Sequence, residues 1–510
     1  MSEHKVVIVG AGMGGLSSAL LLAHQGLDVT VVETSDAPGG KVHSREVQGA
    51  HIDSGPTVFT MRWVFDDLFR QVGTRLEAEM HITPLQVLAR HFWPDGSQLD
   101  LSANAQESET AIAAWSGGDE ARRFRDFCKT TRQLYATLEG PMIRAQRPNM
   151  GGFMGDLGLR GLGVLAQLGP MRNLWQQLGH QFHDPRLRQL FARYATYCGS
   201  SPWQAPATLM LIAQVEMDGV WSVEGGMVGM AQALARVARR HGAVFRYQST
   251  CQRIEKRQGR VCGVHLTSGE FLPADRVIFN GDAGALRQGL LGEEVRQAVP
   301  ASAPPRSLSA LTWSLHTPVA GVALDRHNVF FQNTYASEFE DIFEHQRLPR
   351  QPTVYVCAQD RPASLPVGAD ERIFCLVNAP ACGDGNAITE EALEQCQTQT
   401  FQHLRQLGLH LQPTAANSLR TTPQDFHRRF PASGGALYGQ ATHGWTSIFS
   451  RPGCATPLQG LYLAGGSVHP GPGVPMAALS GQRAAEAVMA SLASTSTFPM
   501  GATFGGMSTP

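Results

Sequence analysis

The chain has 510 residues, more than one simple hydrophobic core holds, so the sequence predicts two or three domains. Its 42 basic and 43 acidic residues nearly cancel, which argues against nucleic acid as a partner. The nine cysteines form no Cys-x-x-Cys pair. This pattern favours a reduced cytosolic compartment over a disulfide framework or a zinc site.

The first expected element is a buried parallel strand over residues 6–9, where β-branched residues follow one another. It leads into Gly10, Gly12 and Gly15 and then into an apolar segment that predicts a helix. Strand, glycine-rich turn and helix form the arrangement that places a pyrophosphate at a helix N-terminus. Met13 and Gly14 belong to the same turn. Residues 6–23 lack charge, but their four glycines disfavour a membrane-spanning helix.

A second strand is expected over residues 28–33, and its last residue, Glu33, stands where an acidic side chain accepts hydrogen bonds from an adenosine ribose. Gly39, Gly40 and Lys41 follow shortly afterwards. NAD-binding units do not need this second glycine pair. The flavoproteins of the amine oxidase and carotenoid desaturase superfamily carry it, and the sequence resembles them. The alternative is a glycine-rich turn that packs without a ligand.

Residues 53–57 resemble the Asp-x-Gly-Pro-Thr motif that follows the first flavin unit in carotenoid desaturases. Pro56 fixes one backbone angle and Gly55 frees another, so this loop can lie stiffly beside a ring system. The resemblance therefore places Gly55, Pro56 and Thr57 next to the flavin. An ordinary turn is the alternative.

The composition changes between residues 75 and 215. Residues 107–138 predict polar helix, and residues 150–169 are rich in Leu, Met and Gly, with only Asp156 and Arg160 charged. These two are four residues apart, so they can pair on one helix face. The stretch is either a surface for membrane or lipid-like substrate or a helix packed in a core. By their place in the family's helical domain, Asp156 and Arg160 are the candidate acid–base residues.

Residues 219–227 match the family's Gly-Val-Trp-x-x-x-Gly-Gly-Met motif, which marks the return to the flavin domain. By family analogy, the backbone near Arg253 and Ile254 faces the adenine. Further strands are expected over 243–247, 251–254, 260–266, 271–273, 276–282, 310–315, 353–356 and 373–377, and further helices over 230–240 and 389–407.

Residues 460–488 predict a strand, a Gly/Pro loop and an Ala-rich helix, and resemble the C-terminal flavin motif of carotenoid desaturases. The resemblance implies that Gly465, Gly466 and Ser467 reach the pyrophosphate and ribityl chain. It also implies that the backbone of Val474, Pro475 and Met476 meets the pyrimidine side of the flavin. His469 is either a catalytic histidine or one that holds the loop in place.

The resemblance covers about residues 5 to 490 and implies an α/β fold. A Rossmann-like FAD-binding domain is expected from residues 1–75, 219–305 and 436–492. A substrate domain of mixed sheet and helices is expected in two parts, a helical, membrane-facing part over 76–218 and a second part over 306–435, with a disordered tail over 493–510. Two departures from the family pattern stand out: Lys41 replaces a common Arg, and Gly465-Gly466-Ser467 replaces Gly-Ala-Gly. With Pro472 and Met476, the latter favours the branch that acts on hydroxylated acyclic carotenoids in purple bacteria.

The implied activity is FAD-dependent desaturation of an acyclic carotenoid at the 3,4 position of a 1-hydroxy or 1-methoxy end group. Phytoene desaturation, carotenoid isomerisation, or prenyl-lipid binding without flavin, as in the Rab GDP-dissociation inhibitors, are the alternatives. The water-insoluble substrate predicts a cytoplasmic protein attached peripherally to membrane lipid, around residues 150–180. Oxygen and a quinone remain alternatives as the electron acceptor.

Overall fold

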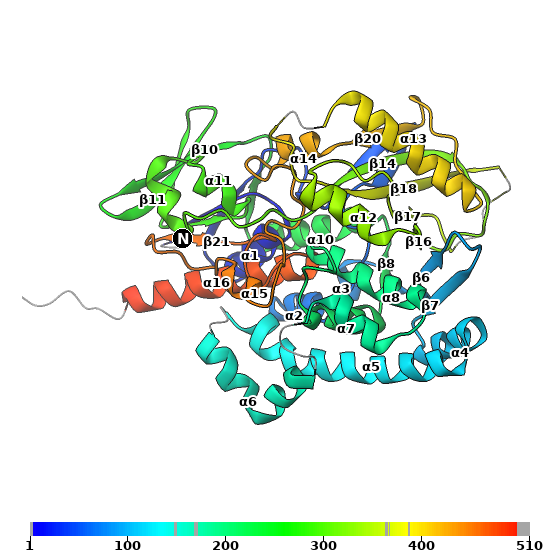
Figure 1. Cartoon of the computed structure of the whole chain (residues 1–510). Coiled ribbons are helices and arrows are strands. Elements are labelled where there is room, and N and C mark those ends of the chain that lie inside the picture. The colour runs from blue at the N-terminus through cyan, green and yellow to red at the C-terminus, as the bar shows by residue number, and fades with distance from the viewer. Residues whose placement is uncertain are drawn as a thin grey trace, which may run out of the picture.

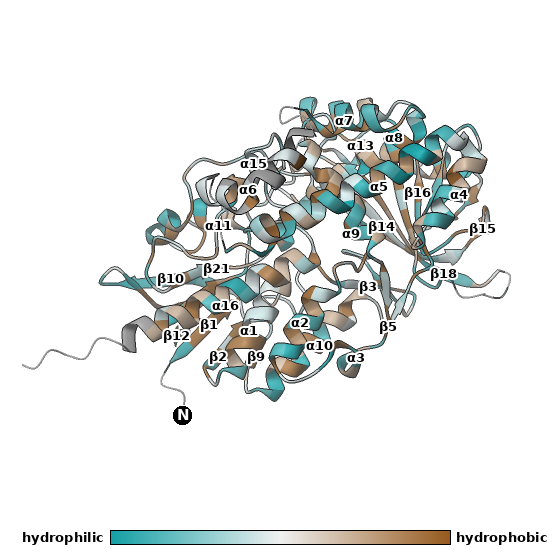
Figure 2. Ribbon diagram, turned by 90° about the horizontal axis from the view of Figure 1, so that it is seen from below, coloured by the Kyte–Doolittle hydropathy of each residue, from teal (hydrophilic) through white to brown (hydrophobic). Residues whose placement is uncertain are grey.

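The structure, a computed structural model, describes residues 4–146, 150–167, 172–362, 366, 368–385 and 388–496 (Figure 1). Viewed from below, these residues form two lobes (Figure 2). One lobe holds the strands β1, β2 and β9 with helices α1 and α10, and the other holds β14, β16 and β18 with helices α4, α5 and α13.

A five-stranded parallel sheet forms the centre of the first lobe, in the order β21-β13-β1-β2-β9. Every neighbouring pair in it is parallel, as expected when helices cover both faces of a sheet of apolar strands. The predicted α/β, Rossmann-like fold is therefore confirmed, and the sheet joins segments from the start, the middle and the end of the chain. Its strands are β1 (Lys5–Val9), β2 (Asp28–Val32), β9 (Val244–Arg246), β13 (Arg276–Phe279) and β21 (Leu461–Leu463).

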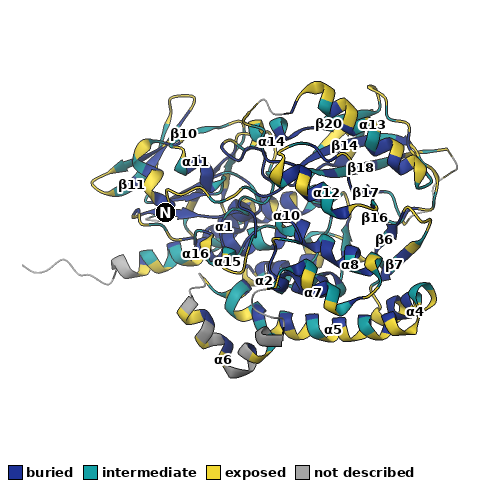
Figure 3. Cartoon of the chain, in the orientation of Figure 1, coloured by how far each residue is buried: buried dark blue, intermediate teal, exposed yellow. Residues whose placement is uncertain are grey.

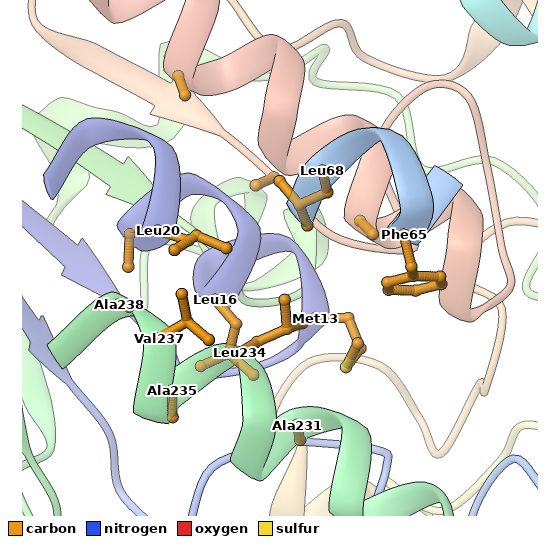
Figure 4. Close-up of a cluster of buried hydrophobic side chains, with 14 of the residues drawn as sticks. Met13, Leu16, Leu20, Phe65, Leu68, Ala231, Leu234, Ala235, Val237 and Ala238 are labelled. Carbon is orange, nitrogen blue, oxygen red and sulfur yellow. The ribbon is translucent and has the colours of Figure 1, made fainter. Parts of the chain in front are cut away.

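Three long helices pack together at this sheet: α1 (Met13–His24), α10 (Met227–Arg240) and α16 (Val474–Ser496). Leu16 and Leu20 of α1 point toward Leu234 and Val237 of α10 (Figure 4), and all four side chains are buried. Helix α2 (Trp63–Gln71) adds Phe65 and Leu68 to the same cluster. This core fixes α1, and with it the glycine-rich turn at its N-terminus.

A seven-stranded sheet forms the second lobe, in the order β20-β14-β18-β17-β16-β6-β7. All of its pairs are antiparallel except β16 with β6. The strands expected near 310–315, 353–356 and 373–377 are confirmed as β14, β17 and β18. β6 and β7 fall in a segment predicted to be helical, which is corrected by their pairing with this sheet. The strands are β6 (Val87–Phe92), β7 (Gln98–Ser102), β14 (Ser309–Pro318), β16 (His327–Phe330), β17 (Val354–Ala358), β18 (Asp370–Ala379) and β20 (Ser418–Thr421).

Helices cover this sheet and extend beyond it. The polar run 107–138 forms two helices, because Gly117 has a φ of 94° and ends the first one. The second, α5, is buried along one side and exposed along the other (Figure 3). The helix expected over 389–407 is confirmed as α13, capped by the Thr389 side chain. These helices are α4 (Ala105–Ser116), α5 (Gly118–Leu138), α6 (Met150–Gln167), α7 (Leu174–Gln181), α8 (Pro185–Ala192), α9 (Leu211–Met217), α12 (Tyr335–Phe339) and α13 (Glu390–Gln406).

Smaller sheets complete the fold. The expected strands β10, β11 and β12 form a three-stranded antiparallel sheet, and β3–β4, β5–β8 and β15–β19 are two-stranded pairs. Their bounds are β3 (Ser44–Val47), β4 (Ala50–Asp53), β5 (Ile82–Pro84), β8 (Trp221–Val223), β10 (Cys251–Arg257), β11 (Arg260–Leu266), β12 (Phe271–Pro273), β15 (Ala320–Gly321) and β19 (Leu409–His410). The short helices are α3 (Leu76–Glu79), α11 (Ala283–Arg287), α14 (Pro423–Arg429), α15 (Ser447–Ser450), the 3₁₀ segments η2 (Arg193–Cys198), η3 (Ala207–Met210) and η4 (Glu293–Ala298), and the π segments η1 (Glu139–Arg144) and η5 (Glu340–Glu344).

The predicted tail over 493–510 is corrected at its start. Helix α16 continues to Ser496, because Leu492 still packs against the core and extends the buried face of the helix. Residues 497–510 lie outside the described residues. None of the described helices is long and apolar enough to cross a bilayer.

Candidate flavin site

The turn between β1 and α1 admits no side chains at its key positions. Gly10 has a φ of 101°, which disfavours any other residue, and its N–H donates to the carbonyl of Val32 at 2.8 Å. A Cβ at Gly15 would lie 2.1 Å from the carbonyl oxygen of Gly10. Gly12 is the N-cap residue of α1 and provides no side-chain cap. The first N–H groups of α1 are therefore open to an anion at this turn.

Gly14 brings the start of the chain against its end. A Cβ there would lie 2.6 Å from Oδ1 of Asn280, 2.8 Å from the amide nitrogen of Gly465 and 3.0 Å from the carbonyl oxygen of Ala477. The side chain of Met13 is buried in the core beside α10 (Figure 4), so only its backbone faces the turn. The predicted N-terminal and C-terminal glycine segments are thus in direct contact.

Glu33 is positioned by backbone donors of the same turn. Its Oε2 accepts from the amide of Ala11 at 2.7 Å, and its Oε1 accepts from the amide of Ser35 at 2.8 Å. A carboxylate has about four acceptor sites, so two remain for a ligand. The side chain is held rigidly where the sequence places the ribose-binding acid.

The second glycine pair lies against the first turn. Gly40 has a φ of 62°, and a Cβ there would lie 3.2 Å from the Cα of Gly12. Nζ of Lys41 donates to the carbonyl of Leu437 at 2.6 Å and to that of Ala436 at 3.3 Å. Burial lowers the pKa of Lys41, and the nearby Asp282 carboxylate opposes this effect.

The 53–57 loop links the two lobes. The lobe of the parallel sheet is called the flavin lobe below, and the lobe of the seven-stranded sheet is called the substrate lobe. Asp53 accepts from the amide of Met227 at 2.7 Å and so caps α10. A Cβ at Gly55 would lie 2.0 Å from the carbonyl oxygen of Lys41, so the loop packs directly on the second glycine segment. Pro56 follows, and the hydroxyl of Thr57 hydrogen-bonds that of Tyr355 at 2.6 Å. The side chain of Thr57 therefore belongs to the substrate lobe.

The adenine prediction falls on β10. The amide of Ile254 donates to the carbonyl of Leu291 at 3.0 Å, so that donor is already bonded within the protein. Arg253 contacts Oε2 of Glu255 at 3.2 Å and Nε2 of His265 at 3.3 Å. Contact of this strand with adenine stays a prediction.

The C-terminal loop is held by side chains from three elements. The amide of Gly465 donates to Oγ of Ser480 at 2.7 Å, and the amide of Ala283 donates to Oγ of Ser467 at 3.1 Å. The carbonyl of Gly466 accepts from Nη1 of Arg451 at 3.1 Å. Val474, Pro475 and Met476 then form the first turn of α16, in which the N–H groups of Val474 and Met476 have no acceptor within the helix.

His469 supports the loop architecture. It is buried, and Nε2 lies 2.9 Å from the carbonyl oxygen of Ala145, with which it hydrogen-bonds. The peptide bond that follows, His469-Pro470, is cis. The interpretation of His469 as a histidine that holds the backbone is therefore favoured over a catalytic role.

Two residues of the site, Asn280 and Arg451, are not among those predicted from the sequence. Nδ2 of Asn280 donates to the carbonyl of Gly10 at 3.2 Å, while its buried Oδ1 has no partner. Arg451 is 4% exposed and donates to the carbonyls of Tyr438, Gln440 and Gly466. Asn280 follows the last strand of the second flavin segment, where side chains reach the ligand edge of a parallel sheet. No motif marks Arg451, which lies in an irregular loop.

The residues fit a dinucleotide. The glycine-rich turns, called the glycine cradle below, bring backbone segments so close that a Cβ would strike protein atoms. The N-termini of α1 and α16 offer free N–H groups, and an unpartnered amide oxygen of Asn280 lies in the same region. Within the described ranges, no three His, Cys, Asp or Glu side chains group as a metal site.

The candidate acid–base pair is not tested by the structure. Asp156 and Arg160 belong to α6, but their side chains lie outside the described residues. Elsewhere on α6, Phe153 and Leu157 are buried, and the ring of Phe153 lies 5.4 Å from that of Phe449, whereas Gly151, Gly152 and Gly155 are exposed. Part of this helix is thus packed in the core.

Comparison with known proteins agrees with this geometry. The model of the family described as flavin-containing amine oxidoreductase matches residues 13–489. The chain belongs to this family. It is 54% identical to a hydroxyneurosporene desaturase of Rubrivivax gelatinosus, over 100% of this chain and 98% of the relative. A 4,4'-diapolycopene oxygenase of a Methylomonas species is 30% identical over 96% of this chain and 99% of its own.

The fold is also found among solved structures. A putrescine oxidase variant with redesigned cofactor binding aligns with a TM-score of 0.59 and 15% identity, over 96% of this chain and 99% of its own. A fatty acid isomerase from P. acnes aligns with a TM-score of 0.56 and 12% identity, over 96% and 98% of the two chains. At this identity the likeness concerns the fold alone.

Proposed function

We propose that the chain is an FAD-dependent carotenoid desaturase. It introduces a carbon–carbon double bond into an acyclic carotenoid, at the 3,4 position of a 1-hydroxy or 1-methoxy end group. The observation that carries this proposal is the similarity over the whole chain, at 54% identity, to the hydroxyneurosporene desaturase of Rubrivivax gelatinosus. The glycine cradle and the free helix N-termini support FAD as the flavin.

The FAD would be held along the contact between the two ends of the chain. Backbone N–H groups of the first turn serve its pyrophosphate, and the remaining acceptor sites of Glu33 serve the adenosine ribose. When bound, the flavin accepts a hydride from the carotenoid and so supplies the oxidising chemistry. The proposed contacts are Gly10, Gly12, Met13, Gly14, Gly15, Glu33, Gly40, Lys41, Gly55, Pro56, Thr57, Arg253, Ile254, Gly465, Gly466, Ser467, Val474, Pro475 and Met476.

The protein itself contributes positive charge, the positioning of the bound groups and the exclusion of water. Lys41 and Arg451 are cations that bond to backbone carbonyls, and no carboxylate among the described residues lies within 4.0 Å of either. Two such cations favour an anionic ligand, which the pyrophosphate and a reduced flavin ring both provide. The N-terminus of α16 adds N–H donors on the pyrimidine side.

Three further assignments complete the proposal. Asp156 and Arg160 take part in proton removal, by their place on α6. The protein works in the cytoplasm, attached peripherally to membrane lipid around residues 150–180, because its substrate is insoluble in water. Oxygen or a quinone reoxidises the flavin.

Anaerobic incubation tests the activity. Purified protein reconstituted with FAD should bleach its flavin absorbance when given a 1-hydroxylated acyclic carotenoid, and the polyene absorbance should shift to the red. Phytoene serves as the comparison substrate. Conversion of phytoene, with no conversion of the hydroxylated carotenoid, would establish phytoene desaturation instead. A protein that takes up no FAD would fit a prenyl-lipid binder without catalysis.

A further inference from the structure

A partly buried cation lies among aromatic side chains of the substrate lobe. Arg193 begins η2, and its Nη1 donates to the hydroxyl of Tyr197 at 3.3 Å. The guanidinium carbon lies 5.6 Å from the ring centre of Tyr197 and 5.4 Å from that of Tyr355. A guanidinium has five N–H donors. Across the described residues, only the donor to Tyr197 has a hydrogen-bond acceptor.

Two buried carboxylates on which the charge of Arg193 acts are hydrogen-bonded to other groups. Glu216 accepts from the hydroxyl of Tyr194 at 2.5 Å. Glu338 accepts from Nδ2 of Asn378 at 2.7 Å and from the amide of Thr353 at 3.0 Å. Neither forms an ion pair with Arg193, although its charge acts on both. The N–H donors of Arg193 that Tyr197 does not use are therefore available to a ligand.

Two further polar atoms beside Arg193 lack partners. The hydroxyl of Tyr335 and Nε2 of His327 have no hydrogen bond, although the residues are only 5% and 2% exposed. The ring of His327 stacks at 6.1 Å on that of Tyr355, whose centre lies 5.4 Å from the Arg193 guanidinium carbon. The positive charge of Arg193 also acts on Tyr335. Burial, reinforced by Arg326 and Arg193, lowers the pKa of His327 to about 3. The imidazole is therefore neutral, and Nε2 either donates or accepts one hydrogen bond.

The cluster continues to the predicted position of the flavin ring. Nδ1 of His327 hydrogen-bonds the hydroxyl of Tyr355 at 2.7 Å, and that hydroxyl bonds Thr57 at 2.6 Å. Thr57 directly follows Gly55 and Pro56, the loop expected beside the ring. The polar atoms therefore begin at the flavin site and end at Arg193.

The segment that begins at Arg193 also packs against the C-terminal loop. Arg193, Tyr197, Cys198 and Tyr438 are each partly exposed, and a Cβ at Gly199, directly after Cys198, would lie 2.8 Å from Cδ2 of Tyr438. Next to Tyr438, a Cβ at Gly439 would lie 3.0 Å from Ser467 of the flavin loop. These residues thus join Arg193 to the flavin segment.

We propose that Arg193, Tyr335 and His327 form the subsite that binds the oxygen on C1 of the carotenoid end group. C1 is two carbons from C3, so its oxygen must lie a few ångströms from the carbons that react. His327 is similarly close to the 53–57 loop, because the Tyr355 hydroxyl bonds both His327 and Thr57. A hydrocarbon end group leaves the three polar groups unpaired, and a site built in this way discriminates strongly against an analogue that lacks the oxygen. The inference rests on the proposed function and specifies how that function selects its substrate.

Two substitutions test the subsite in the FAD-loaded enzyme. Tyr335→Phe removes a hydroxyl that has no partner, so folding is preserved, and it should raise KM for a 1-hydroxylated carotenoid by about 2- to 12-fold. Arg193→Lys keeps the charge but loses the fork of donors, and should raise this KM by about tenfold or more. The inhibition constant of the same polyene without oxygen should stay constant in both. Tyr247→Phe removes a hydroxyl bonded to Arg239 at the surface and should change neither constant.

The subsite and the proposed function can be refuted separately. If the wild-type enzyme converts the hydroxylated carotenoid, but both substitutions leave its KM unchanged or change KM and the inhibition constant in parallel, the subsite is refuted and the activity stands. If the wild-type enzyme converts no hydroxylated carotenoid, the proposed function itself fails. Flavin content and thermal unfolding of each variant, equal to wild type, confirm that a changed KM is not a loss of folded protein.

Discussion

Gly14→Ala tests the contact between the two ends of the chain. The new methyl group would meet Oδ1 of Asn280 at 2.6 Å, the Gly465 amide at 2.8 Å and the Ala477 carbonyl at 3.0 Å. Overpacking of this kind costs about 1–3 kcal/mol. Rotating Asn280 away would also break its 3.2 Å bond to Gly10, at a cost of about 1 kcal/mol. We expect the free energy of unfolding to fall by about 2–4 kcal/mol.

Urea unfolding of the apoprotein measures this loss directly. Repeating it with FAD at about 100 times its dissociation constant adds about 2.7 kcal/mol to wild type. The same FAD concentration should add less to the variant, because the clash pushes Gly465 away from α1 and opens the cradle. Gly155→Ala is the matched control: Gly155 lies in α6, and an added Cβ meets no atom within 4 Å. It should be neutral or stabilise the protein by up to about 1 kcal/mol.

The reasoning would be refuted by a Gly14→Ala protein whose unfolding free energy lies within about 0.5 kcal/mol of wild type, with or without FAD. That result would mean that α1 and the C-terminal loop are further apart than the structure places them. A loss that appears equally in Gly155→Ala would point to a general cost of the substitution.

Three further predictions concern single groups. Glu33→Gln replaces a carboxylate that holds two amides, and should weaken FAD binding by about 10- to 150-fold in a fluorescence titration; unchanged binding would exclude Glu33 from the ribose site. Arg451→Lys should leave carbonyls unsatisfied, at about 1.5–3 kcal/mol for each bond lost, and should lower the flavin retained on gel filtration. Burial lowers the pKa of His91 to about 3 and that of His403 to about 4, below the unfolded value of about 6.5. The unfolded state therefore binds more protons than the folded state. The free energy of unfolding is full above about pH 6.5 and falls toward pH 4, by about 2 kcal/mol per histidine at pH 5. An unfolding free energy in urea that does not change over this range would contradict the prediction.

The flavin lobe could be predicted because its features are local in sequence. Strand, glycine turn and helix follow one another at both ends of the chain, and each glycine is required by backbone contacts a few residues away, such as Gly15 against Gly10. Glu33 also lies at the end of its own strand. Such features depend on neighbours in sequence, which a motif records.

The substrate lobe was predicted less well, for a physical reason. β6 is buried on both faces and has no alternation, and β16 is only four residues long, so neither has a periodic pattern. They pair with each other across more than two hundred residues of sequence, whereas β6 and β7 are neighbours joined by a short turn. The pairing of β6 with β16 leaves no local trace.

The polar groups of the substrate lobe follow the same rule. Arg193, His327 and Tyr335 come from a 3₁₀ segment, a strand and a short helix, and none of them belongs to a pattern that points to a site. Their unpaired atoms become apparent only when the three segments are brought together. Sequence motifs point to the cofactor because it binds backbone groups of glycine-rich turns, which are local in sequence. The substrate, by contrast, meets side chains from distant segments. The specificity of this protein should therefore change with single substitutions at Arg193 or Tyr335 that leave every flavin motif intact.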